Sequence, residues 1–165
     1  MSNQPVQKTF DYLFKAVHAE DGWIHPLRDA VQDVTAEEAA YKPAEGVASI
    51  WDVVAHATPY LYDVVRALRG DVKKPHEDWQ EITDTSANAW AALRDELLAG
   101  IDALGSEIGK LSDVDFLVAP PNRETARWEI LVDISVHDAY HAGQIVKLKQ
   151  LYAASKVGAK ETAAV

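Results

Sequence analysis

The sequence contains no cysteine in its 165 residues. This absence excludes disulfide bonds and thiolate metal ligands, and it fits a reducing compartment. The side chains that remain as ligands for a metal ion are those of His, Asp and Glu. A chain of this length forms one domain of ordinary size with a single continuous core.

Long apolar runs are also lacking. No stretch approaches the roughly 20 apolar residues that a membrane-spanning helix needs. The first residues, Met1 to Lys8, have neither the basic segment nor the apolar segment of a secretory signal. We therefore expect a cytoplasmic protein with no membrane partner.

Basic residues are in the minority. The 16 Lys and Arg residues face 26 Asp and Glu residues, which gives a formal net charge of −10 at pH 7. Such a surface repels phosphate backbones, and the sequence has no concentrated block of Lys and Arg. This balance argues against nucleic acid as a partner.

Helical periodicity is the dominant pattern, and no segment alternates with the period of two that a strand requires. Shorter helical pieces are expected at Leu27–Val34 and after Thr35, beyond a break at Trp23–Pro26. The sequence thus predicts an all-α protein, an antiparallel four-helix bundle, in one domain over residues 1–154 with a frayed tail at 155–165. The four principal helices are expected at about residues 6–20, Ile50–Leu68, Asp84–Leu111 and Glu124–Ala154.

The second principal helix has clear signals at both ends. Ser49 and Asp52 have the spacing of a capping box, and Gly70 is suited to end the helix. Pro59 lies inside the helix, where it removes one backbone hydrogen bond and favours a bend just after His56.

Two histidines lie four residues apart in the last helix. His137 and His141 follow Ile134 and precede Ile145 in steps of three or four, which is the spacing of an inward-facing stripe. Residues four apart project from one helical face at a Cβ separation of roughly 5–6 Å. The pair therefore reaches one metal ion, or forms two core histidines that each bond a carbonyl or a water.

His56 is a third inward-facing histidine, because it shares a stripe with Val53 and Tyr60 in the second helix. Burying three polar rings costs free energy unless each finds a partner, and one shared divalent ion supplies all three partners. The remaining histidines are interpreted otherwise: His18 and His25 as structural or surface residues, and His76 as a solvated loop residue.

Four polar side chains have the spacing to orient an imidazole by a hydrogen bond. The alternative for each is an ordinary solvated residue, and no residue stands out as a catalytic base. These four are Asp52, Asp133, Asp138 and Gln144. Aromatic residues that line a pocket over the metal, or else belong to the core, are Trp51, Tyr60, Trp79 and Tyr140.

Two segments, Ser49–His56 and His137–Ile145, resemble the paired signature of the DinB-like (YfiT-type) metal-binding four-helix bundles. The resemblance extends from about residue 8 to residue 152. It implies that His56, His137 and His141 bind one divalent ion per chain, nickel or zinc, and that the chain forms a homodimer. Characterised members include thiol-dependent transferases, among them bacillithiol transferase and mycothiol-dependent maleylpyruvate isomerase, while many members have no known activity.

Three neutral imidazoles leave a metal ion at least one position for water or substrate. We therefore consider three functions for the chain. The first is a metal-dependent enzyme that transfers a low-molecular-weight thiol or hydrolyses a small substrate. The second is a stress-response protein that binds the metal without turnover, and the third is a helical bundle that acts through its dimer surface without metal.

Overall fold

The computed structural model describes residues 4–20, 22–72 and 74–162, and within these ranges all regular structure is helical. The prediction of an all-α protein is therefore confirmed. Its elements in chain order are α1 (Pro5–Phe14), the π-helical turn η1 (Lys15–Ala19), α2 (Leu27–Gln32), α3 (Ala36–Ala40), α4 (Ile50–Arg69), α5 (Ala87–Ile108), α6 (Asp113–Phe116) and α7 (Arg127–Thr162).

Helix α4 begins and ends where the sequence predicts. The Ser49 side chain accepts a hydrogen bond from the Asp52 backbone N–H at 3.2 Å, and the Ser49 N–H donates to Asp52 Oδ2 at 2.8 Å. Gly70 ends the helix with a φ of 82°, a left-handed conformation that only glycine adopts without strain. Between these ends α4 is one helix that continues through Pro59.

The first helical segment changes its winding before it ends. In η1 the N–H of Glu20 donates to the carbonyl of Lys15 at 2.8 Å, five residues earlier, so the last turn is wider than an α-helical turn. His18 lies in this turn and is fully buried. The chain then breaks as expected, and α2 begins directly after Pro26.

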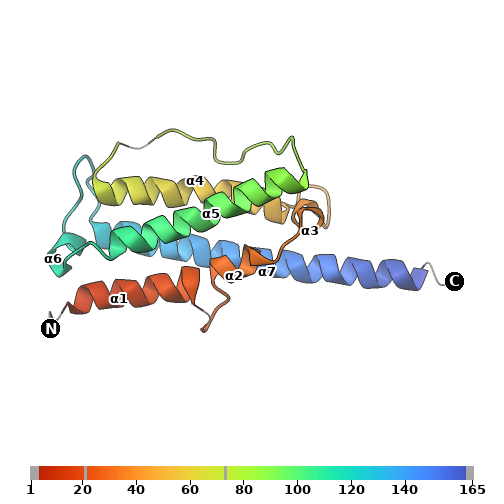
Figure 1. The fold of residues 1–165 in the computed structure, drawn as a ribbon, viewed down its shortest axis with the longest axis horizontal. Coiled ribbons are helices and arrows are strands. Elements are labelled where there is room, and N and C mark those ends of the chain that lie inside the picture. The colour runs from red at the N-terminus through yellow and green to blue at the C-terminus, as the bar shows by residue number, and fades with distance from the viewer. Residues whose placement is uncertain (1–3, 21, 73, 163–165) are drawn as a thin grey trace.

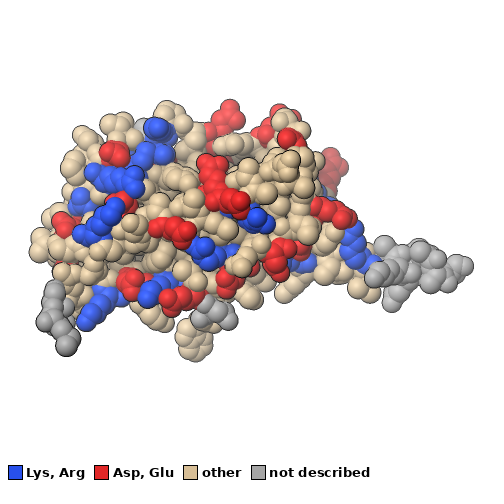
Figure 2. Space-filling view, viewed as in Figure 1, with Lys and Arg blue, Asp and Glu red and all other residues tan. Residues whose placement is uncertain are grey.

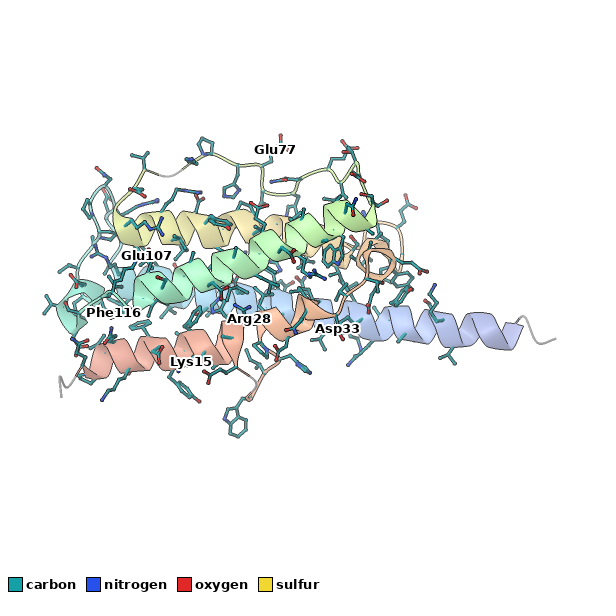
Figure 3. All side chains as sticks on the ribbon, in the orientation of Figure 1. Lys15, Arg28, Asp33, Glu77, Glu107 and Phe116 are labelled. Carbon is teal, nitrogen blue, oxygen red and sulfur yellow. The ribbon has the colours of Figure 1, made fainter. Side chains whose placement is uncertain are left out.

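Helix α6 was not predicted, because Ser112–Arg123 was expected to be an irregular connection. Ser112 and Asp115 form the same capping arrangement as Ser49 and Asp52, with the Ser112 N–H donating to Asp115 Oδ2 at 2.8 Å. Phe116 at the end of α6 is fully buried (Figure 3) and stacks on Phe10 of α1 with ring centroids 4.9 Å apart. The short helix thus closes one end of the core.

The four long segments lie side by side, with α4 packed against both α5 and α7 (Figure 1). Helices α4 and α5 run in the same direction. Near their first turns Trp51 packs on Trp90 with ring centroids 5.3 Å apart, and at their last turns Arg69 pairs with Glu107 at 2.7 Å. The prediction of an antiparallel bundle is therefore wrong for this pair of helices.

The connection between α4 and α5 explains the difference. The described parts of this connection, residues 71–72 and 74–86, run along the outside of α4 back to the level of its first turn (Figure 1). A chain of this length extends to roughly 50 Å, whereas the 20 residues of α4 measure about 30 Å at the α-helical rise. A short turn would have made α4 and α5 antiparallel, but this crossover allows them to be parallel.

Helices α4 and α7 do run antiparallel. Arg127 at the start of α7 donates to the carbonyl of Leu68 at the end of α4. With 36 residues α7 is the longest helix, and its C-terminal end projects beyond the other helices (Figure 1). It continues past the expected end at Ala154 to Thr162, while residues 163–165 lie outside the described residues. The frayed tail stays a prediction.

The core lies between α4, α5 and α7 and is covered by α1 and α2. Arg28 of α2 pairs with Asp102 of α5 across this packing (Figure 3). On the face drawn in Figure 2, acidic and basic side chains of the described residues are interspersed. None of the helices in the described part of the chain has the length and apolarity needed to cross a bilayer.

Candidate metal centre

Three imidazoles meet between α4 and α7. His56 Nε2 lies 3.2 Å from His137 Nε2, which lies 3.1 Å from His141 Nε2. One ligand atom from each of the three rings falls within 4.8 Å of the others. Because α4 and α7 are antiparallel and in contact, residues 81 positions apart in the chain reach the same depth of the protein. That these side chains bind a metal ion stays a prediction.

The opposite nitrogen of each ring, Nδ1, faces an oxygen acceptor. The three pairs are His56 with the carbonyl of Asp78 at 2.8 Å, His137 with Asp138 Oδ1 at 2.8 Å, and His141 with Gln144 Oε1 at 2.7 Å. An oxygen acceptor requires the proton to be on Nδ1. In the neutral rings this assignment leaves the Nε2 lone pairs directed at one another.

This arrangement fits a divalent ion. The Nε2 atoms of neighbouring rings are 3.1 and 3.2 Å apart, so their lone pairs repel each other. In the neutral rings no proton is available on Nε2 to bridge them. At a metal–nitrogen distance of about 2.1 Å, two ligand nitrogens are roughly 3.0 Å apart at a right angle and roughly 3.4 Å apart at the tetrahedral angle. The observed spacings lie between these values. Burial, together with the neighbouring His137 and His56, lowers the pKa of His141, which favours its neutral form.

Asp138 supports the site from within the core. Its side chain is fully buried, Oδ1 accepts from His137, and Oδ2 accepts from His18 Nε2 at 2.9 Å. Burial alone would raise the pKa of Asp138, but the hydrogen bonds from His137 and His18 outweigh it and lower the pKa. An ionised carboxylate therefore joins the wide turn of η1 to the histidine cluster.

Asp138 was among the residues predicted to orient an imidazole, whereas the contact of His18 with Asp138 was not predicted. The two residues are 120 positions apart, so no local spacing relates them. His18 Nδ1 also lies 3.2 Å from the carbonyl of Phe14. Both nitrogens of this buried ring thus have partners within the protein. This agrees with the interpretation of His18 as a structural residue and not with a surface position.

Gln144 orients His141, as its spacing suggests. Its side-chain oxygen accepts from His141, and its amide nitrogen donates to the hydroxyl of Tyr140 at 3.0 Å. Tyr140 is 63% exposed, so this chain of hydrogen bonds links the buried site to the surface of α7.

The other two acidic residues do not lie at the histidines. The Asp52 carboxylate bonds Ser49 at the start of α4 and pairs with Lys42 at 3.0 Å. Asp133 is on the exposed side of α7. His25 is also exposed, and Trp51 is buried in the core against Trp90.

Residues 76–79 in the connection between α4 and α5 supply contacts that were not predicted from the sequence. Besides its carbonyl, Asp78 brings a carboxylate oxygen to 3.1 Å from His56 Nδ1, and this oxygen accepts from the Tyr60 hydroxyl at 2.8 Å. That hydrogen bond raises the pKa of Tyr60. The ring of Trp79 stacks on His56 with centroids 4.2 Å apart. No periodic pattern marks an irregular segment, so only the candidate role of Trp79 was anticipated.

His76 in the same connection was expected to be solvated, and this expectation is wrong. Its side chain is only 14% exposed, and Nε2 lies 2.9 Å from Oδ2 of Asp63 on α4. Its ring also meets the edge of Tyr60 at a centroid distance of 4.8 Å. His76 therefore holds the connection between α4 and α5 against α4, close to the histidine cluster.

Comparison with known proteins identifies a family for the chain and a solved structure of similar fold. A family model described as the DinB superfamily matches residues 21–145, a range that includes all three clustered histidines. No curated protein matches the sequence. A crystal structure described as "the conserved protein of locus from Enterococcus faecalis" is similar in fold, with a TM-score of 0.56 and 17% identity, over 88% of this chain and 94% of that one.

Proposed function

The chain belongs to the DinB superfamily, and on this premise we propose that it binds one divalent metal ion, nickel or zinc, through His56, His137 and His141. One observation carries the proposal: the imidazoles of two buried histidines and the half-buried His137 direct Nε2 lone pairs at one point while each Nδ1 is held by an oxygen. We also infer that the four long segments form a DinB-like four-helix bundle, in which such sites lie between facing helices.

We further propose that the protein is a metal-dependent enzyme. A divalent ion held by three imidazoles would act as a Lewis acid and lower the pKa of a water or thiol in a remaining position. The protein's own groups act on the rings: Asp138, Gln144 and Asp78 fix the proton on each Nδ1 and hold the ring orientations. The ring of Trp79 covers one side of His56 and keeps water from it.

The substrate is proposed to be a low-molecular-weight thiol, with a small hydrolysable molecule as the other option. Support comes from the DinB-like resemblance, whose characterised members include thiol-dependent transferases. The absence of cysteine in the chain is consistent with this, because the reacting thiol then comes from the substrate.

Two measurements on the purified protein test the proposal together. Elemental analysis is expected to give one divalent ion per chain, and a thiol-transfer assay across cellular thiols is expected to show turnover that a chelator removes. Absence of a stoichiometric metal would leave a metal-free helical bundle, and the site would then be a cluster of core histidines.

A metal-binding protein without turnover, acting in a stress response, is the second candidate function. The observation that favours it is that the connection between α4 and α5 covers one side of the site. Trp79 of this connection stacks on His56, and Asp78 accepts a hydrogen bond from Tyr60 of α4. In that case the ion holds α4 against α7. The two functions differ in whether an added thiol changes the absorption spectrum of the cobalt-substituted protein, because only an open position admits the thiol.

We also propose that the chain pairs as a homodimer through α7. Trp128, Val136 and Tyr140 lie at multiples of four residues on this helix and are 42%, 66% and 63% exposed. At about 100° per residue, the three side chains span an arc of about 120° around the helix axis, with Val136 between Trp128 and Tyr140. An exposed apolar stripe of this kind is typical of an interaction surface.

A further inference from the structure

A small cavity opens beside the histidine cluster. Its volume is about 160 Å³, and it lies between the C-terminal half of α4, the start of α7 and the segment that precedes α7. Val64, Ala67 and Ile130 form its apolar wall. Its polar lining consists of Tyr60, Asp63, Arg123 and Thr125.

Arg123 is the unusual member of this lining. Its Nη2 is buried, and among the described residues it has no hydrogen-bond partner. A buried guanidinium nitrogen without an acceptor costs free energy. Arg66 nearby also has an unpaired Nε, but its Nη2 is paired with Asp63. Because Nη2 is sealed inside the protein, the remaining nitrogens of the Arg123 guanidinium are the donors that can meet an acceptor in the cavity.

Asp63 lines the same cavity but is not the acceptor for Arg123. Oδ1 of Asp63 pairs with Arg66, and Oδ2 lies 2.9 Å from His76 Nε2. Its carboxylate is therefore already held on both oxygens. The negative charge of Asp63 also limits the charge of the ligand. It would repel an anion with two charges more strongly than an anion with one.

Tyr60 connects the cavity to the three histidines. Its ring lies 5.0 Å from His56 and 5.0 Å from His137, measured between centroids, and it also lines the cavity. Its hydroxyl is held by Asp78 at 2.8 Å. The cavity and the histidine cluster are therefore separated by one aromatic ring along the contact between α4 and α7.

We propose that Arg123, assisted by the Thr125 hydroxyl, binds the carboxylate of a small substrate whose reacting group lies at the three histidines. A guanidinium attracts a carboxylate by its charge and donates a charge-assisted hydrogen bond to it, and the apolar wall accommodates a short hydrocarbon chain. The substrate class is thus a monocarboxylate with a short apolar body. This inference rests on the proposed metal-dependent function for the reacting end of the substrate.

The first arm of the test needs no metal. Propionate and its uncharged analogue propionamide are titrated into the metal-free protein while the arginine Nε–H signals are followed by NMR. Propionate is expected to shift the Arg123 signal and propionamide to leave it unchanged, with binding weakened at least about tenfold in R123Q. R94Q is the matched control, because Arg94 pairs with its neighbour Asp95 on α5. Equal effects of both probes, or unchanged propionate binding in R123Q, would overturn the proposal.

The second arm separates this proposal from the proposed function. Short mercaptocarboxylates and the corresponding mercaptoalcohols are added to the cobalt-loaded protein, and the visible spectrum is recorded. The carboxylates are expected to bind more tightly in the wild type but not in R123Q or T125V. Equal affinity for both series would overturn the carboxylate site while leaving the metal site intact. If no thiol changes the spectrum, the proposed function fails, and the propionate titration still decides the role of Arg123. Inorganic phosphate is also titrated into the metal-free protein under the conditions of the first arm, and tighter binding of phosphate than of propionate would overturn the monocarboxylate class.

Discussion

His18 Nε2 lies 2.9 Å from Oδ2 of Asp138, and this contact joins the wide turn η1 to the N-terminal third of α7. The other oxygen of the same carboxylate accepts from His137. A rigid, fully buried carboxylate between two imidazoles restricts how the second ring can turn. The orientation of His137 therefore depends on a residue near the start of the chain.

Replacing Asp138 with Asn tests this dependence. An amide can present its NH₂ group to Nδ1 of His137 and so favour the proton on Nε2, where it blocks metal binding. We expect the affinity for a divalent ion to fall about 10- to 100-fold, measured by competition with a chelating dye. D133N is the control on the exposed side of α7. Equal affinities of D138N and the wild type would show that the carboxylate does not orient the ring.

The three clustered histidines were predictable because helical phase decides which residues face inward. His56, His137 and His141 share stripes with apolar neighbours, and two packed antiparallel helices bring such stripes together. Gln144 was predictable because it lies three positions after His141 on the same helix, where side chains are neighbours. Local spacing indicated which residues face inward, whereas the meeting of His56 with His137 and His141 followed from the bundle hypothesis, and the role of Gln144 also from the DinB-like resemblance.

Contacts made by irregular segments could not be predicted in this way. Asp78 and His76 belong to a crossover with no periodic pattern, and their positions follow from the path of the chain over α4. The same crossover makes α4 and α5 parallel, a topology that depends on where the chain returns rather than on either helix. His18 reaches Asp138 only because α1 and η1 pack beside α7.

Replacing His141 with Ala should remove one of the three ring nitrogens and abolish stoichiometric metal binding. Two remaining imidazoles form a much weaker site, and the truncation also leaves Gln144 without the N–H that it accepts. Elemental analysis after desalting measures the metal content. H25A serves as the matched control, because His25 is exposed. An unchanged metal content in H141A would exclude His141 as a ligand.

Acidification should weaken metal binding and destabilise the metal-free protein. Burial lowers the pKa of His141 below its ordinary value of 6.5, so as the pH falls the unfolded chain takes up this proton before the folded protein does. The contribution of His141 to the free energy of unfolding should therefore decrease as the pH drops from 6.5 towards the lowered pKa and change no further below it. Protons also compete with the ion for each Nε2.

Urea unfolding of the metal-free protein across this pH range measures the first effect, and H141Q should show a shallower decrease than the wild type. Metal occupancy measured by dialysis at each pH follows the second effect. Full occupancy retained at about pH 4, well below the ordinary histidine pKa, would contradict ligation by imidazoles.

Gly70 should resist substitution. Its φ of 82° places the chain in the left-handed region, and a Cβ there would lie 2.8 Å from Cδ of Pro121. We expect G70A to lower the free energy of unfolding by at least about 1–2 kcal/mol, measured by urea denaturation. G143A is the control with the opposite sign, because Gly143 lies within α7 with nothing within 4 Å of an added Cβ. Alanine there should raise stability by about 0.5–1 kcal/mol. A neutral result for G70A would mean that the end of α4 rearranges.

The apolar stripe on α7 gives the last prediction, which concerns the proposed homodimer. If Trp128, Val136 and Tyr140 are buried against a second copy, a charge at the centre of the stripe would be desolvated without a partner. V136E should therefore convert the dimer to a monomer in light scattering after gel filtration, whereas V114E on the exposed side of α6 should not. Because Tyr140 bonds Gln144, which bonds His141, separation of the subunits should also weaken metal binding. A wild-type protein that is monomeric at all concentrations would contradict the dimer, and a dimer unaffected by V136E would place its interface elsewhere.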